Sequence, residues 1–251
     1  MTESNTLFDE VCSDDFLNFS FNGRSYADQL QDSIRKTQQL SAIRVHLRTL
    51  PASSGPIEVV WVQHDFGFMG GSLGCAEGEK ITRAFEHGTK NGLAVVVACK
   101  SGGARMQEGT SSLMQMAKVS VAVDAHQRKG LPFIAVLSDP TYGGVSASYA
   151  MQADVKVAVS AGTRIGFAGP QVILNTMCGG DQAQYDVECP ADFQSAKYLL
   201  GKGQVHLSNP NPRPNPNPNL NLNLNLNLNF DLDLNLNLHL KPHLNFNFTL
   251  V

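Results

Sequence analysis

Residues 100–109 read Lys-Ser-Gly-Gly-Ala-Arg-Met-Gln-Glu-Gly, and this decapeptide joins two segments of different character. The apolar run Leu93–Cys99 precedes it. Thr110–Ala125 follows, with apolar residues at near-helical spacing: Leu113, Met114, Met116, Ala117, Val119, Val121 and Val123. We therefore predict a buried strand, a glycine turn and a helix. The N–H groups of a first helical turn lack intrahelical partners, so the turn favours a phosphate, a carboxylate or a developing oxyanion. For Gly102 and Gly103 alone, a tight turn without a ligand is the alternative.

The same alternation of elements continues on both sides of this turn. Further strands are expected at Ile57–Val62, Leu131–Leu137, Val155–Val159 and Ile165–Phe167, and helices at Ser25–Leu50, Ala76–Thr89 and Ser146–Ala153. Loops rich in glycine or proline separate them at Asp65–Gly74 and Asp139–Gly144. This alternation favours an α/β fold with parallel strands and right-handed crossovers. Ligands of such folds bind beyond the carboxyl ends of strands, where Gly102-Gly103 and Gly143-Gly144 are placed.

Composition and charge exclude several classes of function. The chain has 251 residues, with 19 basic and 22 acidic side chains and a formal net charge of -3. That balance gives no reason to expect nucleic acid or an anionic membrane as a partner. No apolar run approaches the ~20 residues that span a bilayer. The acidic N-terminus resembles neither a secretory signal nor a transit peptide, so we expect a soluble protein inside the cell.

Several common sites fail on spacing. The five cysteines (Cys12, Cys75, Cys99, Cys178 and Cys189) form no CxxC pair, so neither a disulfide framework nor a four-cysteine zinc site is expected. The segment 74–80 does not have P-loop spacing, and 144–148 is not a GxSxG elbow. No histidine pair has HExxH spacing. His64 beside Asp65 could act as a base, and a structural histidine is the alternative.

From Ser208 onward the composition changes to a dipeptide repeat of Asn-Pro and then Asn-Leu. An in-frame six-base tandem repeat encodes such a pattern, and our hypothesis is that translated simple-sequence DNA has replaced the natural C-terminus. Alternating Leu and Asn would also fit a strand with one apolar face, which is an aggregation hazard when exposed. We interpret residues 208–251 as a disordered low-complexity tail without a function.

Four motifs together resemble one protein family. SGGARMQEG of the central turn is accompanied by DFGFMGGSLG (Asp65–Gly74), LPFIAVLSDPTYGGVSASYAM (Leu131–Met151) and IGFAGPQVI (Ile165–Ile173). In their order along the chain they resemble the carboxyltransferase β subunit of bacterial and plastid acetyl-CoA carboxylase. The resemblance covers residues 25–207, so we expect an N-terminal extension (1–24), a carboxyltransferase domain (25–207) and the tail (208–251). It implies a crotonase-like ββα superhelix, which is an α/β fold.

The resemblance also implies a reaction and partners. A carboxyl group would pass from carboxybiotin, held by a biotin carboxyl carrier protein, to acetyl-CoA, giving malonyl-CoA for fatty acid synthesis. The biotin nitrogen takes the proton, so no side-chain base is needed. An α subunit of the carboxyltransferase completes the enzyme, in bacterial cytoplasm or plastid stroma.

By the same resemblance, the catalytic groups are main-chain amides. We favour Gly143 and Gly144 as the oxyanion hole for the acyl thioester, with Gly102 and Gly103 at the other side of the pocket. Which pair meets which oxygen stays open. The residues that line the substrate pocket are expected to be Met69, Gly70, Gly71, Ala104, Arg105, Phe167 and Gly169. For Arg105 a second possibility is an ion pair with Glu108, one helical turn away.

The chain departs from the family pattern at several points, and other functions stay open. The N-terminal four-cysteine zinc ribbon usual in the family is missing, so no zinc is expected. Gln171 stands where the family has arginine, and the segment 177–188 is longer and more polar than usual. One alternative is a malonate or acyl-CoA decarboxylase subunit, or a CoA hydratase, of the same superfamily. Another is an inactive truncated remnant.

Overall fold

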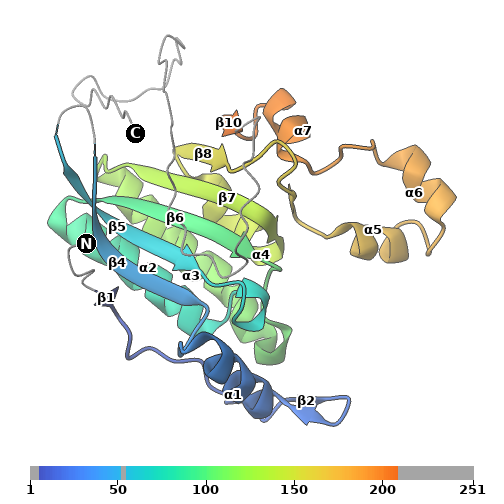
Figure 1. Ribbon diagram of the computed structural model, residues 1–251, viewed down its shortest axis with the longest axis horizontal. Helices are drawn as coiled ribbons and strands as arrows, with labels where there is room; N and C mark the ends of the chain where they lie inside the picture. The colour runs from blue at the N-terminus through green and yellow to red at the C-terminus, as the bar shows by residue number, and fades with distance from the viewer. Residues whose placement is uncertain (1–5, 52–54, 209–251) are drawn as a thin grey trace.

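The protein is described here from a computed structural model, which places residues 6–51 and 55–208. Its main sheet has the order β1-β4-β5-β6-β7-β8-β10, with β9 paired to the end of β7 (Figure 1). The strands are β1 (Thr6–Leu7), β4 (Ile43–Leu50), β5 (Ile57–His64), β6 (Ala94–Ser101), β7 (Phe133–Tyr142), β8 (Val155–Ala158), β9 (Ile165–Gly166) and β10 (Leu207–Ser208). A small hairpin, β2 (Ser20–Phe21) with β3 (Arg24–Ser25), lies apart from this sheet.

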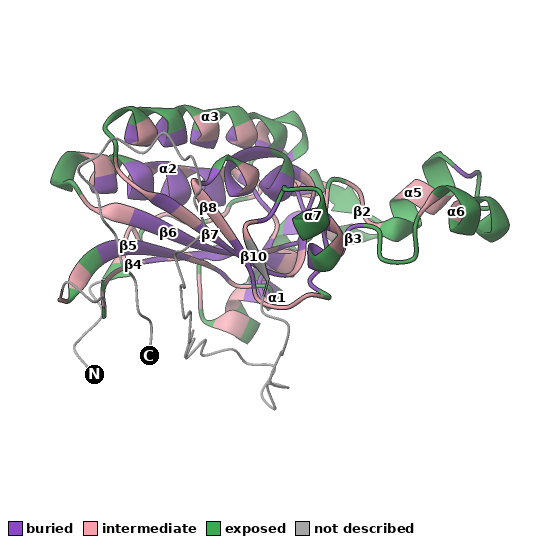
Figure 2. Cartoon of the chain, turned by 90° about the horizontal axis from the view of Figure 1, so that it is seen from above, coloured by how far each residue is buried: buried purple, intermediate pink, exposed green. Residues whose placement is uncertain are grey.

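Helices lie on both sides of the sheet (Figure 2). The longer ones are α1 (Tyr26–Thr37), α2 (Cys75–Asn91) and α3 (Gly109–Arg128); the shorter ones are α4 (Gly143–Val145), α5 (Pro170–Thr176), α6 (Gln182–Glu188) and α7 (Ala196–Gly201). Three single turns complete the list: η1 (Met69–Gly71), η2 (Met106–Glu108) and the π-helical η3 (Ser146–Ala150). Helices α2 and α3 cover one face of the sheet, and α1 lies beyond the other.

The two faces of the sheet differ in what they bury. The face toward α2 and α3 carries the larger core, which includes Val60, Val97 and Leu137 from three neighbouring strands and Phe85 from α2. Phe85 meets Phe133 of β7 edge-to-face at 4.9 Å between ring centroids, a favourable aromatic geometry. The opposite face carries a smaller apolar cluster of Val59, Trp61, Val96, Ala98 and Val136. Strands buried on both faces are typical of a parallel sheet, and β5 to β8 are parallel.

The predicted helix Ser25–Leu50 is correct only in its first half. Helix α1 ends at Thr37, and Gln38 adopts a left-handed conformation with φ 57°. Residues 43–50 form strand β4, antiparallel to β5, so the sheet is mixed and the expectation of parallel strands fails at this edge. The sequence IRVHLRTL alternates apolar and polar residues, which is the period of a strand. Leu40, Ile43 and Leu47 also fit a helical stripe, and that coincidence made the prediction wrong.

The other predicted elements correspond to observed elements with shifted ends. They are the strands at Ile57–Val62, Leu93–Cys99, Leu131–Leu137, Val155–Val159 and Ile165–Phe167 and the helices at Ala76–Thr89, Thr110–Ala125 and Ser146–Ala153. Strand β7 continues through the cis Asp139-Pro140 bond to Tyr142, so the turn expected from Asp139 begins only at Gly143. The apolar stripe expected on α3 is divided. Val119 and Val123 are buried, but Leu113, Met114 and Val121 face outward.

Residues 6–24 join the same body as the sheet, because β1 pairs with β4 and Ser13 bonds to buried side chains. At the other end, Leu207–Ser208 pairs in parallel with β8. The segment with α5 and α6 projects away from the sheet (Figure 1). The tail predicted from residue 208 lies, apart from Ser208, outside the described residues. In residues 6–51 and 55–208, no helix is both long and apolar enough to cross a bilayer.

Candidate active site

Two glycine turns meet where neighbouring parallel strands β6 and β7 end. Gly103 follows β6, and Gly143 follows β7. Their main chains are in contact, because a Cβ built on Gly143 would lie 2.7 Å from the Cα of Gly103. Gly143 has φ 59° and Gly103 has φ 121°, and both values belong to the region that favours glycine. The sequence prediction that these turns lie together at the carboxyl ends of the strands agrees with this geometry.

Not every amide of the two turns is available to a ligand. The N–H of Gly143 donates to the carbonyl of Phe167 at 2.9 Å, and that of Gly102 donates to the carbonyl of Gly70 at 3.0 Å. The N–H of Gly103 donates to the hydroxyl of Ser101 at 3.0 Å. Main-chain amides with such partners cannot also stabilise a substrate oxygen without breaking these bonds. In this structure the amides of Gly102, Gly103 and Gly143 are therefore not the free donors that the sequence analysis expects.

Two amides remain. Among the described residues, no hydrogen bond outside the regular helices and strands uses the N–H of Ala104 or Gly144. Both groups flank the contact between the turns: the Cβ positions of Gly143 and Gly103 lie 3.6 Å from the nitrogen of Ala104 and 3.7 Å from that of Gly144, respectively. Gly144 is also in the first turn of α4, whose N–H groups lack intrahelical acceptors. This pair of donors is the arrangement that an oxyanion needs.

A third glycine loop, residues 69–71, packs against the turn that follows β6. Residues Met69, Gly70 and Gly71 all have positive φ, with values of 47°, 65° and 64°. At Gly71 a side chain is impossible, because its Cβ would lie 2.2 Å from the carbonyl oxygen of Lys100. A left-handed conformation at a non-glycine residue such as Met69 is strained, and such strain is concentrated at functional sites.

The remaining predicted residues border the second turn. Phe167 holds the Gly143 amide through its main-chain carbonyl, while its side chain is 72% exposed. Gly169 caps α5, and its Cβ position lies 3.9 Å from the ring of Tyr142. The structure therefore brings together all predicted site residues except one.

The exception is Arg105, whose side chain is buried and turned away from the turns. Its guanidinium forms ion pairs with Glu77 (2.8 Å) and Glu108 (3.3 Å). It also donates to the hydroxyl and carbonyl oxygens of Ser72, at 2.9 Å and 2.8 Å, and to the hydroxyl of Ser13 at 2.9 Å. With its donors occupied, Arg105 cannot hold a substrate in this structure, which corrects the substrate-binding expectation. Of the two roles considered for Arg105, the ion pair with Glu108 is the one observed.

The charges in this buried cluster support one another. Burial alone would raise the pKa of Glu77, but the Arg105 charge and the hydrogen bond from Ala42 N–H outweigh it and lower the pKa. Burial alone would lower the pKa of Arg105, and the neighbouring Glu77 raises it instead. The carboxylate of Glu108 accepts the Tyr26 hydroxyl and the Cys75 N–H, both at 2.6 Å. The cluster thus ties α1 and the start of α2 to the turn after β6.

His64 is a structural residue rather than a base. Its Nδ1 lies 3.2 Å from the carbonyl oxygen of Gly71, so this nitrogen carries the proton and donates it. Its Nε2 then accepts the Tyr149 hydroxyl at 2.7 Å. Burial lowers the pKa of His64 to about 4, so the ring is neutral near pH 7. His64 therefore links the loop 69–71 to η3, the segment that follows the Gly143-Gly144 turn.

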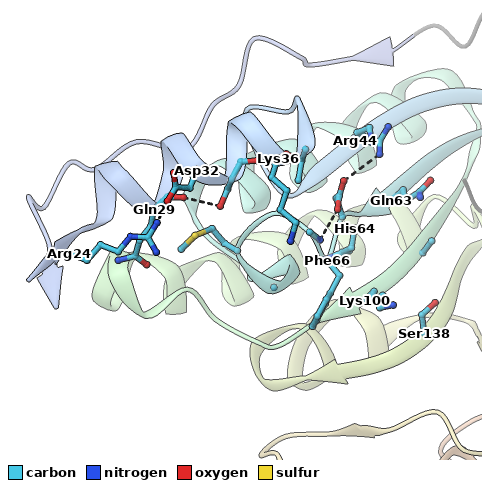
Figure 3. A pocket seen from close by; sticks show the side chains of 17 residues that line it. Arg24, Gln29, Asp32, Lys36, Arg44, Gln63, His64, Phe66, Lys100 and Ser138 are labelled. Carbon is cyan, nitrogen blue, oxygen red and sulfur yellow. Dashed lines mark hydrogen bonds and ion pairs between the residues drawn. The ribbon is translucent and has the colours of Figure 1, made fainter. Parts of the chain in front are cut away.

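A cavity of about 950 Å³ adjoins the glycine loops (Figure 3). It lies between α1 and the carboxyl ends of the strands, and Met69, Gly70, Lys36 and Lys100 are among its lining residues. Because Gly70 touches Gly102 through a main-chain hydrogen bond, the cavity and the glycine turns are neighbours. In the described ranges, no cluster of three or more His, Cys, Asp or Glu side chains could hold a metal ion.

Several residues that shape the site escaped prediction from sequence. Ser101 fixes the Gly103 amide, and Ser146 bonds to the carbonyls of Gly143 and Gly166. The contribution of α1 to a cavity was also missed. A serine directly after a predicted strand is a weak signal, and no local pattern relates α1 to β6 across such a separation in sequence.

Known proteins are similar to this chain in sequence. The family model described as "Carboxyl transferase domain" matches residues 37–191. The acetyl-coenzyme A carboxylase carboxyl transferase subunit beta of Acaryochloris marina is 45% identical over 185 residues, which are 72% of this chain and 56% of that protein. A Salinispora arenicola relative named for subunits beta/alpha is 53% identical over 146 residues, covering 58% of this chain and 24% of its own.

Solved structures agree with the fold. A Pseudomonas malonate decarboxylase hetero-tetramer in complex with malonate matches with a TM-score of 0.58 and 25% identity, covering 68% of this chain and 62% of that chain. The transcarboxylase 12S structure with methylmalonyl-coenzyme A and methylmalonic acid bound matches with a TM-score of 0.56 and 26% identity, covering 68% and 31%.

These findings fix the fold and the family. The chain spans 56% to 59% of the length of the first curated relatives it matches. The crotonase-like α/β fold expected from the motifs is confirmed. On the extent of the family match and the identity to these relatives, this chain belongs to the carboxyl transferase domain family.

Proposed function

We propose that this chain is the β-type carboxyltransferase subunit of an acetyl-CoA carboxylase, which moves a carboxyl group from carboxybiotin to acetyl-CoA and forms malonyl-CoA. The observation that carries this proposal is the pair of amides, Ala104 and Gly144, at the contact of two glycine turns, for which no hydrogen bond outside the regular helices and strands is found in residues 6–51 and 55–208. The identity to named β subunits supports the choice of substrate.

The two amides fit the charge that develops in this reaction. Removing a proton from the acetyl group of a thioester places negative charge on the thioester oxygen. The N–H groups of Ala104 and Gly144 would each donate to that oxygen, and one such donor is worth roughly 3 kcal/mol in a transition state. The close contact between Gly103 and Gly143 supports this role, since it would hold the two turns together before substrate binds.

The partners of the titratable side chains near the glycine loops, in the part of the chain that the structure describes, fit the same reaction. His64 is neutral and bonded at both ring nitrogens, and Glu108 and Arg105 are paired within their buried cluster. Carboxybiotin, on a biotin carboxyl carrier protein, would supply the carboxyl group and the nitrogen that takes the proton. This chain would then bind and orient the thioester and stabilise its oxygen.

A complete enzyme would require partners. The inferred partners are a carboxyltransferase α subunit and the biotin carrier, and the name of the Salinispora arenicola relative joins beta and alpha subunits in one protein. We place the assembly in bacterial cytoplasm or plastid stroma. Fatty acid biosynthesis is the inferred destination of the malonyl-CoA.

The test is the reverse half-reaction with the full chain and an α subunit from the same source. Malonyl-CoA-dependent carboxylation of free biotin is expected, with release of acetyl-CoA. Release of CO2 from malonyl-CoA at the same rate without biotin would instead favour a decarboxylase subunit. A folded, α-bound protein without either reaction would contradict the proposal and favour the inactive remnant.

A further inference from the structure

We propose that Gln194 is a positioning residue of the proposed reaction, which holds residues 165–168 against the second glycine turn and so sets the direction of the Gly144 amide. This inference rests on the proposed function and deepens it. Gln194 lies where the chain returns from α6 to the body of the protein, directly before Ser195, the N-cap of α7 (Figure 1). It is remote from the turn in sequence, so only the folded chain brings the two together.

Gln194 bonds to residues 165–168 at both ends of this short segment. Its side-chain Nε2 donates to the carbonyl of Ala168 at 2.7 Å, and its main-chain carbonyl accepts the N–H of Ile165 at 2.8 Å. Gln194 is buried, with 6% of its surface exposed, so water competes little for these bonds. The two contacts together fix the path of the segment.

The conformation of Gln194 is unfavourable in itself. Its φ is 66°, in the left-handed region that side chains rarely adopt. Its Oε1 atom is buried and has no hydrogen-bond partner among the described residues. A Cβ on Gly166 would lie 2.4 Å from the Gln194 Nε2, so any larger residue at 166 would displace this amide. Strain and unpaired buried atoms oppose folding and are concentrated at functional sites, which is why we assign Gln194 a role beyond stability.

Residues 165–168 in turn hold the second glycine turn. The Phe167 carbonyl accepts the N–H of Gly143 at 2.9 Å. The Ser146 hydroxyl lies 2.6 Å from the carbonyl oxygen of Gly166 and 3.1 Å from that of Gly143, and its single proton can go to either. The segment bonded to Gln194 is thus also the segment bonded to the turn.

These bonds determine where the proposed donor points. The carbonyl of Gly143 and the N–H of Gly144 belong to one planar peptide group, so a bond that orients the carbonyl also orients the N–H. The bond from the Gly143 N–H to Phe167 fixes the preceding peptide group in the same way. If residues 165–168 shift, both peptide groups can rotate, because glycine has no side chain to restrict them. Gln194 therefore acts on the oxyanion through the turn, without touching the substrate.

The test compares the full chain with its α subunit in wild type and two variants. Gln194→Met keeps the length of the side chain and removes the donor to Ala168. Gln194→Gly also removes the donor but relieves the left-handed strain, so it decides the question if Gln194→Met does not fold. The control is Gln184→Met, at an exposed residue of α6 whose Nε2 bonds to Glu188 at 2.8 Å.

Two readouts separate positioning from stability. They are kcat and KM for malonyl-CoA-dependent carboxylation of free biotin, and hydrogen exchange of the Gly143 amide, measured by NMR on the full chain alone. We expect both Gln194 variants to lower kcat about tenfold and to leave KM within about twofold, because a misdirected donor weakens transition-state binding without being lost. The Gly143 amide should exchange about tenfold faster in both, since its bond to Phe167 opens more often. Gln184→Met should match the wild type in both readouts.

Other outcomes overturn the inference separately from the proposed function. A wild-type kcat in folded Gln194 variants would show that the turn keeps its geometry without Gln194. A higher KM at unchanged kcat would make Gln194 a residue for substrate binding and contradict its positioning role. A lower kcat with unchanged exchange at Gly143 would place the effect outside the turn and contradict it as well. A wild type without the half-reaction, with faster exchange at Gly143 in the variants, contradicts the proposed function and leaves the link between Gln194 and the turn.

Discussion

Gly103 and Gly143 touch through their main chains, so that a side chain at Gly143 would clash and one at Gly103 would be tightly packed. A Cβ on Gly143 would lie 2.7 Å from the Cα of Gly103, and one on Gly103 would lie 3.2 Å from the Cα of Gly143. Because each residue follows a different strand, this contact sets the distance between the amides of the two turns. The proposed oxyanion hole thus depends on a packing constraint as well as on free donors.

Gly143→Ala should reduce both stability and activity. At φ 59° an L-residue costs roughly 1–2 kcal/mol, and the clash with Gly103 should add about 1–3 kcal/mol. The control is Gly130→Ala, with φ 71° and open space around its Cβ position. Its loss of unfolding free energy measures the cost of the left-handed backbone without a clash. Urea unfolding of both variants measures the difference. Equal losses of unfolding free energy in the two variants would show that a Cβ at Gly143 does not clash with Gly103.

Arg105→Gln should destabilise the fold strongly. It leaves the buried carboxylates of Glu77 and Glu108 without their cation, and breaking such a pair costs about 3–5 kcal/mol. Arg83→Gln is the control, since Arg83 pairs with Glu79 and Glu10 at the surface, where a pair is worth about 1 kcal/mol or less. Chemical denaturation of the two variants compares them. Similar losses of unfolding free energy in Arg105→Gln and Arg83→Gln would contradict the structural role assigned to Arg105.

His64 should make stability depend on pH between about 4 and 6.5. Its folded pKa of about 4 lies below the ordinary 6.5, so the unfolded chain binds the proton more strongly in this window. Stability is therefore full above pH 6.5 and falls as the pH drops, by about 3 kcal/mol from this residue.

His64→Gln removes that contribution. The difference in unfolding free energy between wild type and variant should thus shrink by about 3 kcal/mol from pH 7 to pH 4. The other histidines are present in both proteins, so their contributions cancel in the comparison. If the unfolding free energies of wild type and His64→Gln depended on pH in the same way, His64 would not be the source of this pH dependence.

The sequence predicts the turns and strands well where pattern and position agree. Apolar runs such as Leu93–Cys99, followed within a few residues by glycines, locate strands β6 and β7, and parallel pairing then places both turns at one edge. The same reasoning fails at Ile43–Leu50, because its apolar residues satisfy both a helical and a strand period. Only the antiparallel pairing with β5, which is a tertiary contact, decides between them.

The contents of the site are less predictable than its location. Arg105 stands beside the turn in sequence, yet its side chain points into a cluster with Glu77, whose position depends on the packing of α2. Which amides are free depends on acceptors from distant segments, such as the carbonyls of Gly70 and Phe167. Neither local propensity nor spacing contains this information, because these contacts form only when the chain is folded.

The most direct test of the central claim removes one proposed donor without changing any side chain. Replacing Ala104 by lactic acid through nonsense suppression turns its N–H into an ester oxygen. The readout is malonyl-CoA-dependent carboxylation of free biotin by the full chain with its α subunit, and lactic acid at Ala161, in the turn after β8, is the control. We predict that kcat falls by about 10²–10³ for position 104 in a protein that stays folded, with at most a small fall in melting temperature from the weaker Gly103 carbonyl acceptor. A kcat equal to that of the wild type would contradict the assignment of this amide to the oxyanion hole.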